Sequence, residues 1–133
     1  MFRRLRSPPP NLGPREGRLA PCGKAPNCVC SHAGDPPHAI APLEFSGTAA
    51  QAFERLERLI ASLPRTRIVT RTGNYLHVDF TTPLLRFTDD VEFLLDEQAG
   101  VIHVRSASRI GHSDLGTNRR RVEAIRERFR AAG

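Results

Sequence analysis

Proline is concentrated at the start of this chain, and its distribution limits where regular structure can form. Nine of the eleven prolines in the 133-residue sequence lie within residues 1–46. Proline fixes φ and lacks a backbone donor, so it interrupts helices and central strands. We therefore expect residues 1–10 to form a disordered basic arm and residues 11–46 to wrap the domain as an irregular segment. Regular secondary structure should begin only after residue 46.

The segment that follows has the periodicity of a helix. Apolar residues recur at helical spacing from Ala49 to Leu63, which predicts an amphipathic helix. Thr48 fits the first position of a capping box, and Pro64 sets the end. A second amphipathic pattern, over residues 118–130, predicts a closing helix.

Between the two helical patterns the apolar period changes to two, which is the period of β-strands. Alternation predicts strands over residues 67–71, 75–81, 89–96 and 101–106. Each strand has one apolar face, which needs a cover on that face only. The expected fold is an α+β two-layer sandwich, with a four-stranded antiparallel sheet and two helices covering one face. The chain length predicts a single domain, over residues 11–133.

Charge is distributed in blocks along the chain. The formal net charge is +6, divided as +5 over residues 1–24, −4 over residues 35–99 and +5 over residues 105–130. An acidic middle between basic ends suits internal ion pairs as well as it suits a polyanion. The chain has one Tyr and no Trp, so it lacks the aromatic platform on which bases stack. The composition therefore argues against nucleic acid as a partner.

The three cysteines are informative about the cellular compartment of the protein and about metal binding. No stretch reaches the ~20 apolar residues of a membrane span, and the first ten residues lack the apolar core of a secretory signal. We therefore expect a cytoplasmic protein in which Cys22, Cys28 and Cys30 are reduced thiols. Cys28, Cys30 and His32 are weak candidate metal ligands, since zinc prefers four ligands and a wider spacing between paired cysteines. We expect no metal and no cofactor.

Serine and arginine gather at the start of the closing helix. Residues 105–121 contain five Arg and three Ser. Arg119 and its two neighbours stand at the positive end of the helix dipole, where cations are unfavourable and free N–H groups can bind an anion. The pattern predicts a pocket for a carboxylate or phosphate. Its candidate residues are Arg105, Ser106, Ser108, Arg109, Asp114, Asn118 and Arg119. The alternative is internal pairing of these arginines with the acidic stretch Asp89–Glu92.

Titratable residues share one face of the predicted sheet. By strand parity His77, Asp79, Glu92, His103 and Arg105 lie on the face away from the helices, which we expect to face solvent. A histidine beside a carboxylate can act as a general acid or base. The candidate catalytic residues are His77, His103, His112, Asp89, Asp90 and Glu92. The alternative is that these residues form an ordinary exposed sheet face, which carries polar side chains without any catalytic role.

Three groups of residues resemble the DUF1499 family. The stretches that carry the resemblance are Leu12–Cys22 with Pro26–Val29, then Phe87–Phe93, then His103–Gly116 running on to Asn118–Glu123. The resemblance covers about Leu12 to Phe129. It implies little about mechanism, because no activity is established for the family as a whole. Members often carry a secretory, lipoprotein or plastid-targeting leader. Cys30 stands where the family usually has Ser, and His112 where Tyr is common.

The sequence supports three classes of function. The leading hypothesis is a small-molecule-binding domain that recognises an anionic group through Ser hydroxyls and Arg guanidinium groups. The second is a small cofactor-independent enzyme that uses acid–base chemistry at the same pocket. The third is a structural or partner-binding scaffold whose polar network only holds the fold. The sequence does not identify the ligand or the oligomeric state.

Overall fold

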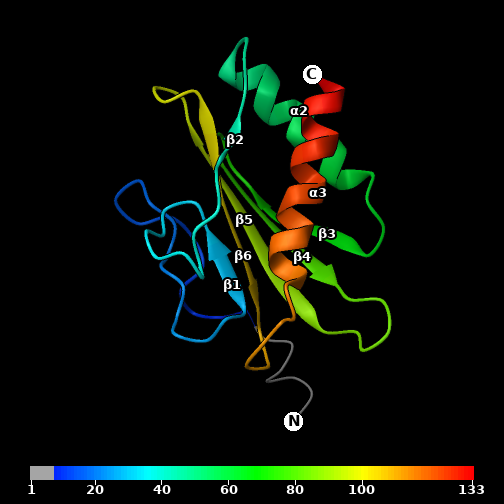
Figure 1. Cartoon of the computed structure of the whole chain (residues 1–133). Coiled ribbons are helices and arrows are strands. Elements are labelled where there is room, and N and C mark those ends of the chain that lie inside the picture. Colours follow the sequence, from blue (N-terminus) through cyan, green and yellow to red (C-terminus); the bar gives the residue numbers. More distant parts are fainter. Residues whose placement is uncertain (1–7) are drawn as a thin grey trace.

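The computed structural model describes residues 8–133 and contains two helices and one antiparallel sheet (Figure 1). The strands are β1 (Cys28–Cys30), β2 (Leu43–Glu44), β3 (Thr66–Arg71), β4 (Tyr75–Thr81), β5 (Thr88–Asp96) and β6 (Val101–Ser108). The helices are α2 (Ala49–Ala61) and α3 (Thr117–Ala132). Neither helix is long and apolar enough to cross a membrane. The predicted α+β class, the antiparallel sheet and the two helices are confirmed.

The sheet has six strands, so the expectation of four is wrong. The strand order is β1-β6-β5-β4-β3, and β2 also pairs with β6. Both missed strands lie along the outer edge of β6, β1 beside residues 105–107 and β2 beside residues 101–102. Segments of two and three residues are too short to show a period, and their pairing with β6 is a tertiary effect. β6 itself continues to Ser108, two residues beyond the predicted end of this strand at residue 106.

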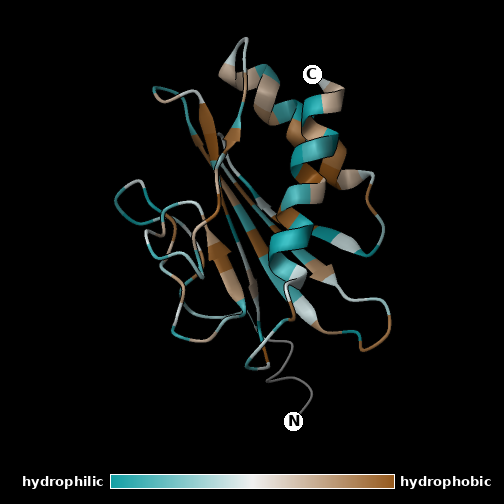
Figure 2. Cartoon of the chain, in the orientation of Figure 1, coloured by the Kyte–Doolittle hydropathy of each residue, from teal (hydrophilic) through white to brown (hydrophobic). Residues whose placement is uncertain are grey.

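The two helices cover one face of the sheet and form the main core with it (Figure 1). Helix α2 begins at the predicted cap, where Thr48 Oγ1 accepts from the backbone N–H of Gln51 at 3.2 Å. The two helices bury their apolar stripes on the sheet, and in Figure 2 the outward side of α3 is hydrophilic. The core includes Phe53, Leu56 and Ile60 of α2, Val122, Ile125 and Phe129 of α3, and Val78, Val91, Phe93 and Val104 of the sheet.

The opposite face of the sheet is covered by the N-terminal segment, residues 8–42. A second apolar cluster joins Leu19 and Cys30 to Tyr75 of β4 and Leu94 of β5. The expectation that this face meets solvent is therefore wrong. Strand parity shows which residues share a face but not what lies over them. We call this side the far face.

Within the N-terminal segment, a disulfide joins Cys22 to Cys28, the first residue of strand β1. The expectation that all three cysteines are reduced is contradicted by this bond. Cys30 is a free, fully buried thiol, and burial raises its pKa. The predicted disordered arm lies mostly outside the described residues, since residues 1–7 are not described. The boundary at residue 10 stays a prediction.

We predict that the disulfide stabilises the covering segment. Closing a loop of this size, with a sequence separation of 6, removes conformational entropy from the unfolded chain and is worth about 2 kcal/mol. Replacing Cys22 by Ser should lower the free energy of unfolding by about that amount in urea titrations. The intact mass of unreduced protein should lack two hydrogens. Three free thiols in the unreduced protein, or a Cys22→Ser variant that still loses stability on addition of reductant, would contradict the assignment.

Candidate functional site

Two adjacent acids of β5 are the centres of two buried polar clusters on opposite faces of the sheet. Asp89 pairs in register with Ser108, and Asp90 with Ala107, so their side chains point to opposite sides. The helix-face cluster consists of Asp89, Ser106, Ser108, Asp114, Asn118 and Arg121. The far-face cluster consists of Tyr75, His77, Asp90, Glu92, Arg105 and Arg109.

The helix-face cluster is almost fully satisfied by its own members. Arg121 donates to Asp89 at 2.7 Å and to Asn118 Oδ1 at 2.8 Å. Ser106 donates to the same Asn118 oxygen at 2.6 Å, and Asn118 Nδ2 donates to Ser108 at 2.9 Å. Burial raises the pKa of Asp89, and Arg121 only partly offsets that effect. These contacts hold the start of α3 against the sheet and leave few free donors.

The N-terminus of α3 already holds an anionic group from its own chain. The Asp114 carboxylate accepts from the backbone N–H groups of Gly116 at 2.8 Å and Asn118 at 3.1 Å. Burial acts to raise the pKa of Asp114, but the Asn118 amide and these N–H groups outweigh it, so the pKa is lowered. Arg119 donates to the carbonyls of Pro37 and Ala39. Four of the seven predicted ligand residues, Ser106, Ser108, Asp114 and Asn118, thus meet at this helix end, but they are bonded to one another and leave little room for an external anion.

On the far face, Asp90 joins a histidine and an arginine. His77 Nε2 donates to Asp90 at 2.7 Å, and the Arg109 guanidinium binds both carboxylate oxygens, at 2.8 and 2.9 Å. All three side chains are largely buried. Burial acts to raise the pKa of Asp90, but the hydrogen bonds from His77 and Arg109 outweigh it and lower the pKa. Asp90 is thus held as a carboxylate by two donors.

Glu92 and Arg105, also on the far face, are less well satisfied. One carboxylate oxygen of Glu92 accepts from the Tyr75 hydroxyl at 2.6 Å and from the backbone N–H of Gly13 at 2.8 Å. Its other oxygen, Oε1, lies 3.6 Å from Arg105 Nη1, beyond hydrogen-bond distance. Among the described residues, Glu92 Oε1 and Arg105 Nε have no hydrogen-bond partner. Arg105 is 5% exposed, so its charge is buried with weak partners.

A cavity of about 410 Å³ opens beside Arg105 and Arg109. Its other walls come from Asn27, Cys28, Asp90, Ala107, Ser108, Gly23 and residues 8–11. Three of the predicted ligand residues, Arg105, Ser108 and Arg109, therefore line one cavity. Ser106, Asp114, Asn118 and Arg119 do not line it. Asn27 is a wall residue that the sequence pattern did not single out.

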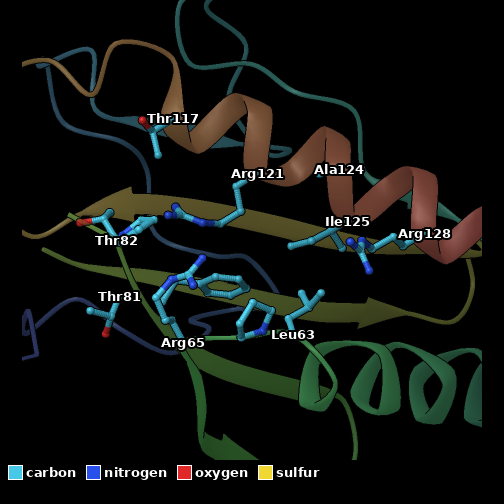
Figure 3. Close-up of a pocket in the computed structure, with 12 residues that line it drawn as sticks. Leu63, Arg65, Thr81, Thr82, Thr117, Arg121, Ala124, Ile125 and Arg128 are labelled. Carbon is cyan, nitrogen blue, oxygen red and sulfur yellow. The ribbon is translucent and has the colours of Figure 1, made fainter. Parts of the chain in front are cut away.

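A second hollow, of about 260 Å³, lies between α3 and the end of β4 (Figure 3). Its walls are apolar side chains such as Leu63, Phe80 and Ile125. Arg65 and Arg121 reach it from opposite sides, and Arg128 lies further along α3 (Figure 3). Arg121 is bound to Asp89, whereas neither Arg65 nor Arg128 forms an ion pair within residues 8–133.

The remaining predicted catalytic and metal residues are dispersed. His103 stacks on His32 with ring centroids 3.9 Å apart and bonds Ser31, while His112 is exposed on the loop before α3. No group of three or more His, Cys, Asp or Glu in residues 8–133 is placed to hold a metal ion. Cys28 is in the disulfide and is not available as a ligand. Among the predicted catalytic residues, all of which lie in the described part of the chain, only His77 and Asp90 form a hydrogen-bonded histidine–carboxylate pair.

The comparisons with known proteins give a family and no closer relative. A family model described as a protein of unknown function (DUF1499) matches residues 18–129. No curated protein and no solved structure matches the chain. The match covers both polar clusters, including β5, β6 and the start of α3.

We predict that the Asp90–Arg109 pair is a major contribution to stability. Removing one partner leaves a buried charge without its counter-ion, which costs about 3–5 kcal/mol. Asp90→Ala and Arg109→Ala should each lower the free energy of unfolding by that amount, and the double variant should cost less than the sum. The exposed pair Glu127–Arg130, at 3.8 Å, is a matched control whose loss should cost under about 1 kcal/mol. Additive effects of Asp90→Ala and Arg109→Ala would disprove the coupling.

We also predict that His32 makes the fold sensitive to mild acid. Burial, and then the neighbouring His103, lower the pKa of His32 to about 4. Between the usual histidine pKa and pH 4 the unfolded chain binds a proton that the folded chain does not, so stability falls as the pH falls through this range. His32→Gln, which keeps an acceptor for the Leu19 N–H, should flatten this part of the stability profile. An unchanged slope in urea titrations at several pH values would rule out this origin.

Proposed function

Because the chain belongs to the DUF1499 family, whose description assigns no activity, we propose from its own structure that it binds a small anionic molecule. The proposed site is the far-face cavity, with Arg105, Arg109 and Asn27 as the polar side chains in its wall. The ligand would carry a carboxylate or phosphate group. This is the function that the sequence pattern favours. The proposed site, however, lies beneath the N-terminal segment and not at the N-terminus of α3, where the sequence pattern predicted it.

The observation that carries the proposal is the state of Arg105. A guanidinium buried to this extent normally forms several hydrogen bonds, because an unpaired buried charge is costly. Arg105 has one long contact, to the Pro21 carbonyl at 3.4 Å, and the distant Glu92 oxygen. An anion in the cavity would supply a charge-assisted hydrogen bond to this side chain.

The dimensions and walls of the cavity limit the ligand. A volume of about 410 Å³ falls within the range of small-molecule sites. Arg109 is already bound by both oxygens of Asp90, so it contributes less net positive charge than Arg105. These features favour a small organic acid or phosphate ester with one principal anionic group.

Acid–base catalysis in the same cavity is the alternative, and one observation bears on it. Asp90 lines the cavity and is bonded to His77. However, both Asp90 oxygens are occupied by Arg109, and its lowered pKa makes the carboxylate a weak base at neutral pH. Binding without chemistry therefore fits the geometry better.

A cytoplasmic location stays a prediction from the sequence. The Cys22–Cys28 disulfide is the observation against it, because such bonds persist mainly in oxidising compartments. The proposed binding does not depend on the compartment.

We predict that sulfate or phosphate stabilises the fold selectively. A ligand that binds only the folded state raises the free energy of unfolding by about 2.7 kcal/mol at a hundred times its Kd. Thermal unfolding in sulfate or phosphate should therefore occur at higher temperature than in chloride of equal ionic strength, since matched ionic strength removes screening as a cause. Arg105→Gln should abolish the difference.

The matched control is Arg119→Gln. Arg119 carries the same charge but contacts the backbone carbonyls of Pro37 and Ala39 outside the cavity. This variant should lose some stability and keep the full difference between sulfate and chloride. Equal effects of the two salts on the wild-type protein would favour the scaffold alternative, in which the arginines serve only the fold.

A further inference from the structure

Two loops at one end of the molecule expose large apolar side chains. Leu84 and Leu85, in the loop between β4 and β5, are 93% and 70% exposed, and Leu115, in the loop before α3, is 84% exposed. Figure 2 shows the hydrophobic stretch on the β4–β5 loop. These side chains contribute almost nothing to the core, yet each costs free energy by contacting water. Grouped exposed apolar residues usually mark an interaction surface.

The bases of the two loops border the same hollow. The hollow between α3 and β4 is lined by Pro83, which precedes Leu84, and by Thr117, which follows Leu115 by two positions. The β4–β5 loop is closed at its base, where the backbone N–H of Thr82 donates to the Phe87 carbonyl at 2.8 Å and Thr82 Oγ1 accepts from the Phe87 N–H at 2.8 Å. The leucines are therefore held at the tip of a short, closed loop.

The charge around these leucines is positive. Arg86 lies within the β4–β5 loop, Arg65 and Arg128 line the hollow, and Arg120 donates to the Leu115 carbonyl. All four are exposed, and none forms an ion pair within residues 8–133. The acids nearby are engaged within the fold: Asp79 by Arg67, Asp89 by Arg121, and Asp114 at the start of α3. No neighbouring carboxylate thus neutralises this end.

We propose that this end of the molecule docks on an anionic lipid bilayer, with Leu84, Leu85 and Leu115 inserted among the headgroups. Leucine side chains that project from loop tips can enter the headgroup region of a bilayer, where their apolar surface leaves water. The four arginines would lie at headgroup level, where each basic side chain adds attraction to anionic lipid. The surface is separate from the far-face cavity, whose wall residues include none of these seven.

The test is cosedimentation of the full chain with vesicles. The wild-type protein should bind phosphatidylcholine vesicles that contain about 30% phosphatidylserine, release at high salt, and bind pure phosphatidylcholine much more weakly. Replacing both Leu84 and Leu85 by Ser should reduce the partition coefficient about a hundredfold, given about tenfold for each inserted leucine. Replacing both Arg65 and Arg86 by Gln should reduce binding to the anionic vesicles about thirtyfold.

Matched controls distinguish binding through this surface from nonspecific hydrophobic or electrostatic binding. Val69→Ser removes an exposed apolar side chain on β3, and Arg15→Gln removes an exposed charge from the N-terminal segment. Both should bind like wild type, with unfolding temperatures of all variants recorded to confirm folding. The proposal is overturned by a wild-type protein that does not bind anionic vesicles. It is equally overturned by a folded double-leucine variant that binds them as tightly as wild type.

Discussion

The alternation of side chains along β5 is the constraint on which the structure depends. It sends the neighbouring carboxylates Asp89 and Asp90 to opposite faces of the sheet. A buried carboxylate needs a cation and further donors, or its desolvation is not offset. Each face therefore requires its own cover and its own arginine. Arg121 reaches Asp89 from α3, and Arg109 reaches Asp90 from the end of β6, beneath the N-terminal segment.

That requirement accounts for two of the five arginines that the sequence concentrates between residues 105 and 121. Arg109 and Arg121 bind carboxylates, and Arg119 and Arg120 bind backbone carbonyls. Arg105 alone of the five is buried with an unbonded nitrogen. A dense group of arginines in the sequence is thus weak evidence for a ligand, because the fold itself can supply partners for most of them. The binding site is supported here by the unbonded nitrogen of Arg105 and not by the number of arginines.

Periodicity predicted the elements that bury one apolar face, because elements of six or more residues are long enough to show a period. It placed α2, its Thr48 cap and the four long strands, and it correctly grouped His77, Glu92 and Arg105 on one face. It could not predict β1 and β2, since two or three residues have no period. The prolines predicted a wrapping segment over residues 11–46, but not that part of this segment covers the far face. Asp114 had a local signal that was missed: an Asp two residues before a Gly is typical of an Asx-turn.

The exposed leucines have a different physical status from every residue described in the two clusters. Side chains that the fold needs are buried and bonded, as Asn118 is by its contacts with Ser106, Ser108 and Asp114. The side chains of Leu84 and Leu115 are exposed, so the fold does not need them. Polar residues at these loop tips would leave the stability of the fold unchanged. Natural sequences depart from such local rules chiefly where another gain offsets the loss. Arg86, inside the same loop as Leu84, forms no ion pair within residues 8–133. A partner surface that is both apolar and anionic would account for the exposed leucines and for this arginine together.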